Sequence, residues 1–218
     1  MVAFNLFLTL LLRMIKLKSH WKKSWAEKNF RIQFVLTSVL LSVLLFSLSY
    51  FFAFIENREG KSVNDFILNW AEPVDVSIFT FLIIYTITIY TIIVIIKQPR
   101  LFLKALQAYT IILFIRLISL YFVPLEAPQG IIPLRDPFIE RFFYGKTCIT
   151  KDLFFSGHVA TVVLLFLVNP DKKLNWVYVI TIVLLSILIL WQRAHYSFDV
   201  LTAPLFAWIA WKLALKIR

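Results

Sequence analysis

Residues 32–55 read IQFVLTSVLLSVLLFSLSYFFAFI, a run of 24 residues without a charged side chain. About 20 apolar residues in a helix are enough to cross the hydrocarbon core of a bilayer, so this segment predicts a membrane protein. Its apolar residues do not alternate at every second position as in a membrane β-barrel, which favours helices. Similar segments recur along the chain and predict an all-α bundle of six transmembrane helices. The predicted spans are Ile32–Ile55, Val76–Ile96, Leu106–Val123, Leu153–Asn169, Leu174–Trp191 and His195–Trp211.

The composition of the 218 residues indicates a chain that is solvated mostly by lipid. Hydrophobic residues make up 61% of it and charged residues 16%, against roughly 45–50% and about 25% in soluble domains. The single cysteine, Cys148, cannot form an intramolecular disulfide, and no Cys/His cluster has the spacing of a zinc site. Disulfide redox chemistry and structural zinc are therefore excluded.

The formal net charge of +11 is explained by membrane topology. With six spans and a cytoplasmic N-terminus, the inner segments contain 15 of the 23 Lys and Arg residues, and the outer side contains ten of the 12 Asp and Glu residues. Cytoplasmic segments of membrane proteins have an excess of basic residues. We therefore expect both termini in the cytoplasm and no nucleic acid partner, although the net charge alone would suggest one.

Residues 1–30 are expected to form a segment distinct from the six-helix domain at 31–218. Met1–Leu12 is apolar but too short to span, and several basic residues and a Trp pair follow it, a pattern typical of an amphipathic helix in the membrane interface. A secretory signal is the alternative. It is weakened because no basic residue precedes the apolar run and no small-residue cleavage site follows it.

The outer loop Pro124–Asp152 has 29 residues, too many for a plain connector. Within it, Asp136 followed by Pro137 reads as a helix N-cap with proline at the first helical position, so Pro137–Tyr144 is predicted to be a short helix. This helix is either a lid over a site or a simple cover.

Polar side chains gather at the outer ends of three predicted spans. The fourth span opens with DLFFSGH at 152–158, the junction of the fifth and sixth reads RAHYSFD at 193–199, and Arg116 lies near the outer end of the third. Polar groups in membrane segments are costly and are usually functional. Their shared depth on three separate elements predicts a site at the outer face.

Three of these side chains are the expected catalytic residues. His195 and Asp199 are four apart and share a helix face. A carboxylate that accepts the proton of one imidazole nitrogen leaves the other nitrogen with an outward lone pair, which a nucleophile needs. His158, on another helix, can then protonate the leaving oxygen.

The remaining polar groups suit a phosphate. Arg116 and Arg193 carry planar guanidinium groups that match phosphate oxygens. Ser156 and Gly157 at the start of a helix would add backbone N–H donors and the positive end of the helix dipole. The set predicts a phosphoryl site that needs no metal and no cofactor.

Each of these groups also has a structural interpretation. His158 is compatible with an ordinary helix start, His195 and Asp199 with a structural hydrogen bond, and Arg116 with a side chain that reaches to the interface. Arg193 is compatible with a flanking anchor. Two histidines and a carboxylate are also a known catalytic metal-ligand set, so a metal site stays an alternative.

FSGH at 155–158 and HYSFDV at 195–200 resemble the third and fourth motifs of the sphingomyelin synthase branch of the type 2 phosphatidic acid phosphatase superfamily. RLISL at 116–120, followed by Pro124, is similar to the second motif of that branch. The likeness covers roughly residues 75–215. It implies a six-helix bundle whose active site faces the lumen or exterior.

The resemblance also implies roles for individual residues. His195 would be the nucleophile that forms a phosphohistidine, Asp199 its orienting partner, and His158 the acid and base for the leaving group. Asp152 and Tyr196, which lie in or beside the two histidine motifs, join the expected substrate-binding residues.

The sequence therefore predicts a lipid phosphotransferase that moves a phospho-headgroup from a phospholipid donor to a lipid alcohol, ceramide or diacylglycerol. A lipid phosphatase with water as acceptor is the close alternative, because the same phosphohistidine serves both reactions. Departures from the synthase motifs, Thr150 and Lys151 in place of Cys-Gly and Ser197 in place of threonine, leave the substrate open.

A non-enzymatic lipid transporter is the third hypothesis. The polar residues gather at one face instead of lining a route across the bilayer, which counts against it. We expect an integral protein of a bacterial inner membrane, with the active site towards the periplasm or exterior.

Overall fold

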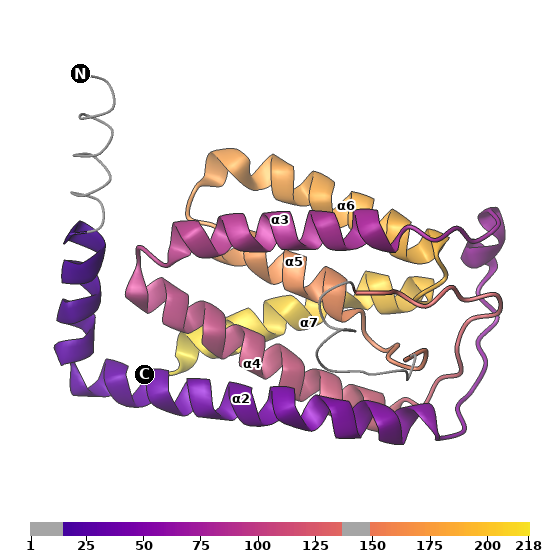
Figure 1. Ribbon diagram of the computed structural model, residues 1–218, viewed down its shortest axis with the longest axis horizontal. Helices are drawn as coiled ribbons and strands as arrows, with labels where there is room; N and C mark the ends of the chain where they lie inside the picture. Colours follow the sequence, from indigo (N-terminus) through magenta and orange to yellow (C-terminus); the bar gives the residue numbers. More distant parts are fainter. Residues whose placement is uncertain (1–14, 137–148) are drawn as a thin grey trace.

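The computed structural model describes residues 15–136 and 149–218 (Figure 1). Within these ranges the chain is helical, with no strand beyond one isolated bridge between Lys61 and Leu125. This confirms the predicted all-α class. The elements are α2 (Lys28–Glu56), η1 (Phe66–Trp70), α3 (Ser77–Ile95), α4 (Pro99–Phe122), α5 (Gly157–Val168), η3 (Lys172–Leu174), α6 (Asn175–Trp191) and α7 (Ser197–Lys216).

Five of the six predicted spans correspond to helices long and apolar enough to cross a membrane, namely α2, α3, α4, α6 together with the preceding η3, and α7. The predicted span Leu153–Asn169 differs, because its helix α5 has only 12 residues. At a rise of 1.5 Å per residue it extends about 18 Å, against a hydrocarbon core of about 30 Å. The helix starts late because residues 149–156 run in extended and bent backbone that is bonded to other segments. The fold thus has five long apolar helices and a shorter sixth.

The short helix α5 lies in the centre of the bundle (Figure 1). It contacts α3, α4, α6 and α7, and seven of its residues are buried. Irregular backbone at membrane depth is tolerated only where protein encloses it. The longer neighbours therefore allow α5 to be short.

A stripe of alanines on α7 sets the distance between the central helices. Ala203, Ala207, Ala210 and Ala214 are fully buried, at helical spacing along one face. The helix α7 packs against α4 and α5. Small side chains let helix backbones approach closely, so the start of α7 lies near the start of α5.

The helix ends next to the motifs meet at one end of the bundle, which we call the site end (Figure 1). Loop side chains cap these helices. The Arg58 guanidinium donates to the carbonyl oxygens of Leu120 and Tyr121, at 2.6 and 2.7 Å, where α4 ends. Asp65 accepts a hydrogen bond of 2.6 Å from the backbone N–H of Ser197, where α7 begins. Helix ends need such partners because their last backbone groups lack intrahelical ones.

The helical segment 15–26 lies at the opposite end and turns steeply away from α2 (Figure 1). Trp21 Nε1 donates to the Ile96 carbonyl at 2.8 Å, and Arg100 forms an ion pair with Glu27 at 2.8 Å. These contacts fix the segment to the turn between α3 and α4. The predicted amphipathic helix, or alternatively secretory signal, at Met1–Leu12 lies outside the described residues. The predicted helix Pro137–Tyr144 also lies outside them.

Candidate active site

His195 and Asp199 lie where the turn after α6 leads into α7. Both are buried, with 3% and 0% of their side chains exposed. Asp199 Oδ2 accepts a hydrogen bond of 3.0 Å from the backbone N–H of Tyr196 and lies 3.4 Å from His195 Nδ1. A carboxylate in this position favours the tautomer that carries its proton on Nδ1. Nε2 of His195 is then free to act as a nucleophile.

His158 is the second residue of α5 and faces the same space. The centroids of its ring and the His195 ring are 6.4 Å apart. Among the residues that the structure describes, His158 Nδ1 has no hydrogen-bond partner although the atom is buried. Phe81 packs edge-on against the His158 ring at 5.7 Å. The two imidazoles therefore face one cavity, His158 from the first turn of α5 and His195 from the turn that precedes α7.

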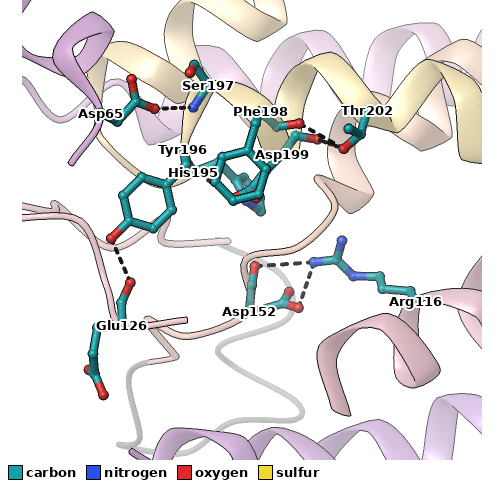
Figure 2. A network of polar contacts seen from close by, with 10 residues as sticks. All are labelled: Asp65, Arg116, Glu126, Asp152, His195, Tyr196, Ser197, Phe198, Asp199 and Thr202. Atoms are coloured by element: carbon teal, nitrogen blue, oxygen red, sulfur yellow. Dashed lines mark hydrogen bonds and ion pairs between the residues drawn. The ribbon is translucent and has the colours of Figure 1, made fainter. Parts of the chain in front are cut away.

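Arg116 reaches this centre from α4 (Figure 2). Its Nη2 donates to the Asp152 carboxylate at 2.6 Å and to the Asp152 carbonyl at 3.3 Å. Its Nη1 is buried and has no partner within residues 15–136 and 149–218. Buried polar groups are nearly always hydrogen-bonded, so the free arm is suited to a bound anion.

Gly157 makes room for the guanidinium. A Cβ atom at Gly157 would lie 3.0 Å from Arg116 Cζ and 3.1 Å from both Nε and Nη1. The absence of a side chain thus lets Arg116 lie directly against the start of α5. Gly157 acts in the site through the position of Arg116.

Ser156 is the N-cap residue of α5 and is fully buried. Its backbone N–H donates to the Asp199 carbonyl at 3.0 Å, so it is not available to an anion. The predicted pair of N–H donors at Ser156 and Gly157 therefore needs correction. The Ser156 amide ties α5 to α7, and its hydroxyl oxygen has no partner in the described part of the chain.

The segment that carries Asp152 is clamped by two acidic side chains. Glu56, at the end of α2, accepts from the backbone N–H groups of Thr150 and Lys151 at 2.9 and 3.1 Å. Lys151 Nζ forms an ion pair of 2.9 Å with Glu126. The hydrogen bonds from Lys151 and from a backbone N–H hold the pKa of Glu126 below its ordinary value. These contacts fix the segment of Asp152 to α2 and to the loop that carries Glu126. They thereby also fix Arg116, which Asp152 binds.

A cavity of about 380 Å³ joins these groups. Its lining includes Arg116, Asp152, Gly157, His158 and His195. Most other lining side chains are apolar, and ligand sites are typically mostly apolar cavities of about 300–1,000 Å³. The apolar and aromatic lining residues are Phe52, Phe81, Ile84, Tyr85, Tyr109, Ile112, Leu113, Ile131, Leu134, Ile149 and Ala194.

Arg193 and Tyr196 point elsewhere. Arg193 has a positive φ of 54° and donates to the carbonyls of Gln129 at 3.0 Å and Ala71 at 3.3 Å. The Tyr196 hydroxyl donates to the Glu126 carbonyl at 3.0 Å (Figure 2). Both line a separate cavity among the loops at the site end. The structure does not bring these two predicted binding residues into the histidine cavity, because their polar groups bind loop backbone.

Gln192 is a residue at the site that the sequence did not single out. It is fully buried. Its side chain accepts from the Val76 N–H at 3.1 Å and donates to Ser77 Oγ at 2.8 Å and to the Pro133 carbonyl at 3.2 Å. Gln192 therefore fixes the turn before His195 to the start of α3 and to the loop that contains Pro133. The only feature of the sequence that could have indicated this role is the position of a polar glutamine between the apolar span Leu174–Trp191 and the motif at 193–199.

Tyr85 and Asp136 were also missed. Tyr85 on α3 donates to the Asp136 carboxylate at 2.7 and 2.9 Å, and both residues line the cavity. A tyrosine within the apolar span Val76–Ile96 gave a weak signal for this pair.

Among residues 15–136 and 149–218, no group of three or more His, Cys, Asp or Glu side chains is arranged to hold a metal ion. In the described part of the chain, the two histidines and Asp199 therefore do not form the ligand set that the sequence left open.

Residues 148–216 match a family model described as PAP2 superfamily C-terminal. The matched region contains α5, α6 and α7, with both histidines and Asp199. Arg116 lies outside it and joins the site through the fold. The match supports the PAP2 superfamily, and with it a lipid phosphatase or phosphotransferase. Comparison with curated proteins and with solved structures found no match.

The Gly157 contact predicts a variant that keeps the fold and loses activity. In Gly157→Ala the new methyl group must displace the Arg116 guanidinium, the flexible end of a long side chain. Alanine is the better residue in a helix interior by about 1 kcal/mol, and because Gly157 is the first residue of α5, up to that amount offsets the displacement. We expect unchanged or higher thermal stability in detergent and at least a roughly tenfold loss of lipid phosphate turnover. Full activity in this variant would contradict the role of Gly157.

The Gln192 contacts predict a second variant with a matched control. Gln107 is also a buried glutamine, and it bonds Gln33 and Lys104 away from the histidines. Gln192→Leu and Gln107→Leu each remove buried hydrogen bonds, so each should lower stability by about 1–3 kcal/mol. Only Gln192→Leu should lower kcat per folded molecule, because only Gln192 holds the His195 turn. Equal kcat in the two variants would show that Gln192 is merely structural.

Proposed function

We propose that this protein is a membrane lipid phosphotransferase that moves a phospho-headgroup from a phospholipid to a lipid alcohol through a phosphohistidine on His195. One observation supports the proposal above all others. Two imidazoles, one from α5 and one from the turn before α7, have ring centroids 6.4 Å apart on a cavity that is also lined by a buried arginine whose Nη1 is unpaired among the described residues. The match of residues 148–216 to the PAP2 superfamily agrees with it.

The first displacement transfers the headgroup phosphate to the enzyme. His195 Nε2 attacks phosphorus, and a P–N bond forms as the bond between phosphorus and the glycerol oxygen breaks. His158 in its protonated form donates its proton to that oxygen, so diacylglycerol leaves as a neutral alcohol. Proton transfer of this kind contributes typically about 10²–10⁴-fold to a rate.

The second displacement regenerates the enzyme. The hydroxyl oxygen of ceramide or of another diacylglycerol attacks phosphorus, and its proton passes to the now neutral His158. The P–N bond breaks and returns its electron pair to His195. Both histidines then have their starting protonation states.

Charge stabilisation falls to Asp199 and Arg116. The Asp199 carboxylate, 3.4 Å from Nδ1, stabilises the positive imidazolium that forms as Nε2 bonds to phosphorus. The unpaired Nη1 of Arg116 binds a phosphoryl oxygen, and Asp152 holds the other arm in place. Preorganised donors of this kind are worth more in a water-poor site than in bulk water.

Lipid substrates fit the surroundings of the site. The cavity has mostly apolar walls below its polar groups, and the helices around it expose apolar side chains. The excess of basic residues on the opposite side supports a site that faces the periplasm or exterior of a bacterial inner membrane, with cytoplasmic termini and the segment 1–30 in the inner interface.

A lipid phosphatase is the second candidate, and the superfamily match favours it equally. Water in place of the lipid alcohol attacks the same phosphohistidine. The two functions differ only in what the acceptor part of the cavity admits.

The experiment uses the purified full-length protein in vesicles with a phospholipid labelled in its headgroup phosphate, with and without ceramide or diacylglycerol. We expect labelled lipid product that depends on the added alcohol. Release of water-soluble phosphate ester alone would instead support the phosphatase.

Histidine variants test the assignment within that assay. His195→Ala and His158→Ala should each lower turnover by at least about 100-fold. His20→Ala is the matched control, because His20 is exposed and contacts Lys97 at the other end of the bundle. Turnover that persists in His195→Ala would contradict the proposed nucleophile.

A further inference from the structure

The histidine cavity continues from the site end towards the middle of the bundle. Tyr109 on α4 and Thr88 on α3 line it in addition to the catalytic groups. Tyr109 precedes Arg116 by seven residues, two helical turns, so the two side chains share a face of α4 about 10 Å apart along the axis. The cavity therefore has a second polar side chain on the same face of α4 as the arginine, two helical turns along the chain.

The hydroxyls of Tyr109 and Thr88 are both unpaired within the described residues. Thr88 Oγ1 is buried and has no partner there. Tyr109 is half-buried, and its hydroxyl forms no hydrogen bond with residues 15–136 or 149–218. A hydroxyl at membrane depth has no bulk water to bond with, so leaving it unpaired costs free energy.

Another tyrosine and threonine in the same bundle show the usual solution. The Tyr178 hydroxyl lies 2.8 Å from Thr91 Oγ1, which itself donates to the Ile87 carbonyl at 2.7 Å. Thr161, also in the cavity wall, donates to the Gly157 carbonyl at 2.8 Å. The hydroxyls of Tyr178, Thr91 and Thr161 are thus satisfied by protein groups. Within the described part of the chain, Thr80 Oγ1 is buried and unpaired like Thr88 Oγ1 but does not line the cavity, whereas Tyr109 and Thr88 line it with unpaired hydroxyls that a ligand can reach.

We propose that Tyr109, assisted by Thr88, is a binding subsite for the carbonyl oxygen at the base of a lipid acyl chain. This inference rests on the proposed function. A lipid whose phosphate sits at His195 and Arg116 extends its acyl chains down the cavity, and its carbonyl groups come a few bonds after the phosphate. A carbonyl accepts hydrogen bonds and has none to donate, which complements two hydroxyl donors.

The subsite would hold the lipid in register with the histidines. A hydrogen bond at Tyr109 and an ion pair at Arg116 fix the substrate at two points along α4, so phosphorus stops beside His195. The same chemistry fits the ester carbonyl of a glycerolipid and the amide carbonyl of a ceramide. Donor and acceptor lipids can therefore both use it.

The test compares lipids that differ only in the carbonyl. Diacyl and dialkyl phospholipids with the same headgroup and chain length compete for the full-length protein in detergent, and native mass spectrometry counts each bound species. We expect the wild-type protein to prefer the diacyl lipid about 3- to 10-fold, the usual effect of one hydrogen bond. Tyr109→Phe should remove this preference and Thr88→Val should reduce it.

Tyr178→Phe is the matched control, since it removes a tyrosine hydroxyl whose partner is Thr91, and it should leave the preference intact. A second competition with diacylglycerol and dialkylglycerol shows whether the acceptor also uses the subsite. Equal binding of diacyl and dialkyl lipids by the wild-type protein, or a preference that survives in Tyr109→Phe, would overturn the subsite.

Turnover is measured separately, so the two proposals can fail independently. With the diacyl phospholipid, Tyr109→Phe should raise KM by the same 3- to 10-fold and lower kcat, because phosphorus is no longer held in register with His195, while KM and kcat for the dialkyl lipid stay unchanged. A tyrosine-dependent diacyl preference in binding without any turnover would retain the subsite and reject the phosphotransferase.

Discussion

The hydrogen bond of 3.0 Å from the Ser156 N–H to the Asp199 carbonyl is the contact on which the rest of the site depends. It joins the first turn of α5 to the first turn of α7, and the alanine stripe of α7 makes that approach sterically possible. His158 follows Ser156 by two residues, and His195 precedes Asp199 by four. One backbone contact between two helix starts thus sets the relative position of the two imidazole rings. Because this contact places the start of α5 deep in the bundle, the helix is short.

The site is assembled at a cost that a purely structural bundle would not incur. Seven buried side-chain polar atoms lack a partner within residues 15–136 and 149–218, and four of them belong to the site. These four are Arg116 Nη1, Ser156 Oγ, His158 Nδ1 and Asp199 Oδ1. Native proteins leave few such groups unpaired, and departures from local rules concentrate where function requires them. A phosphoryl group with its several acceptor oxygens complements the donors in this set.

Much of this could be predicted from the sequence, because it follows from periodicity and hydropathy. The spacing of four residues correctly predicted that His195 and Asp199 meet, but the predicted shared helix face is wrong. His195 lies in the turn before α7, and Asp199 reaches it while accepting from the Tyr196 N–H at the helix start. Span ends of equal depth placed Arg116 with His158. The misses arose where tertiary contacts override local pattern. Residues 153–156 are apolar enough for a helix. Their backbone is nevertheless not helical, because Glu56 accepts a hydrogen bond from the Thr150 N–H and the Asp199 carbonyl accepts one from the Ser156 N–H. Arg193 and Tyr196 lie in a turn in which Arg193 has a φ of 54°, and this turn directs both side chains to the loops. The hydrogen-bond partners of Gln192 are more than 50 residues away in the sequence.

The central claim is that phosphorus becomes bonded to His195, and rapid chemical quenching tests it most directly. The protein is mixed with a phospholipid carrying a radiolabelled headgroup phosphate, quenched in alkali within one turnover, digested, and assigned by mass spectrometry. The account predicts a label that is stable to alkali, lost in acid and located on His195. Turnover at the normal rate with no label on His195 at any time would contradict it.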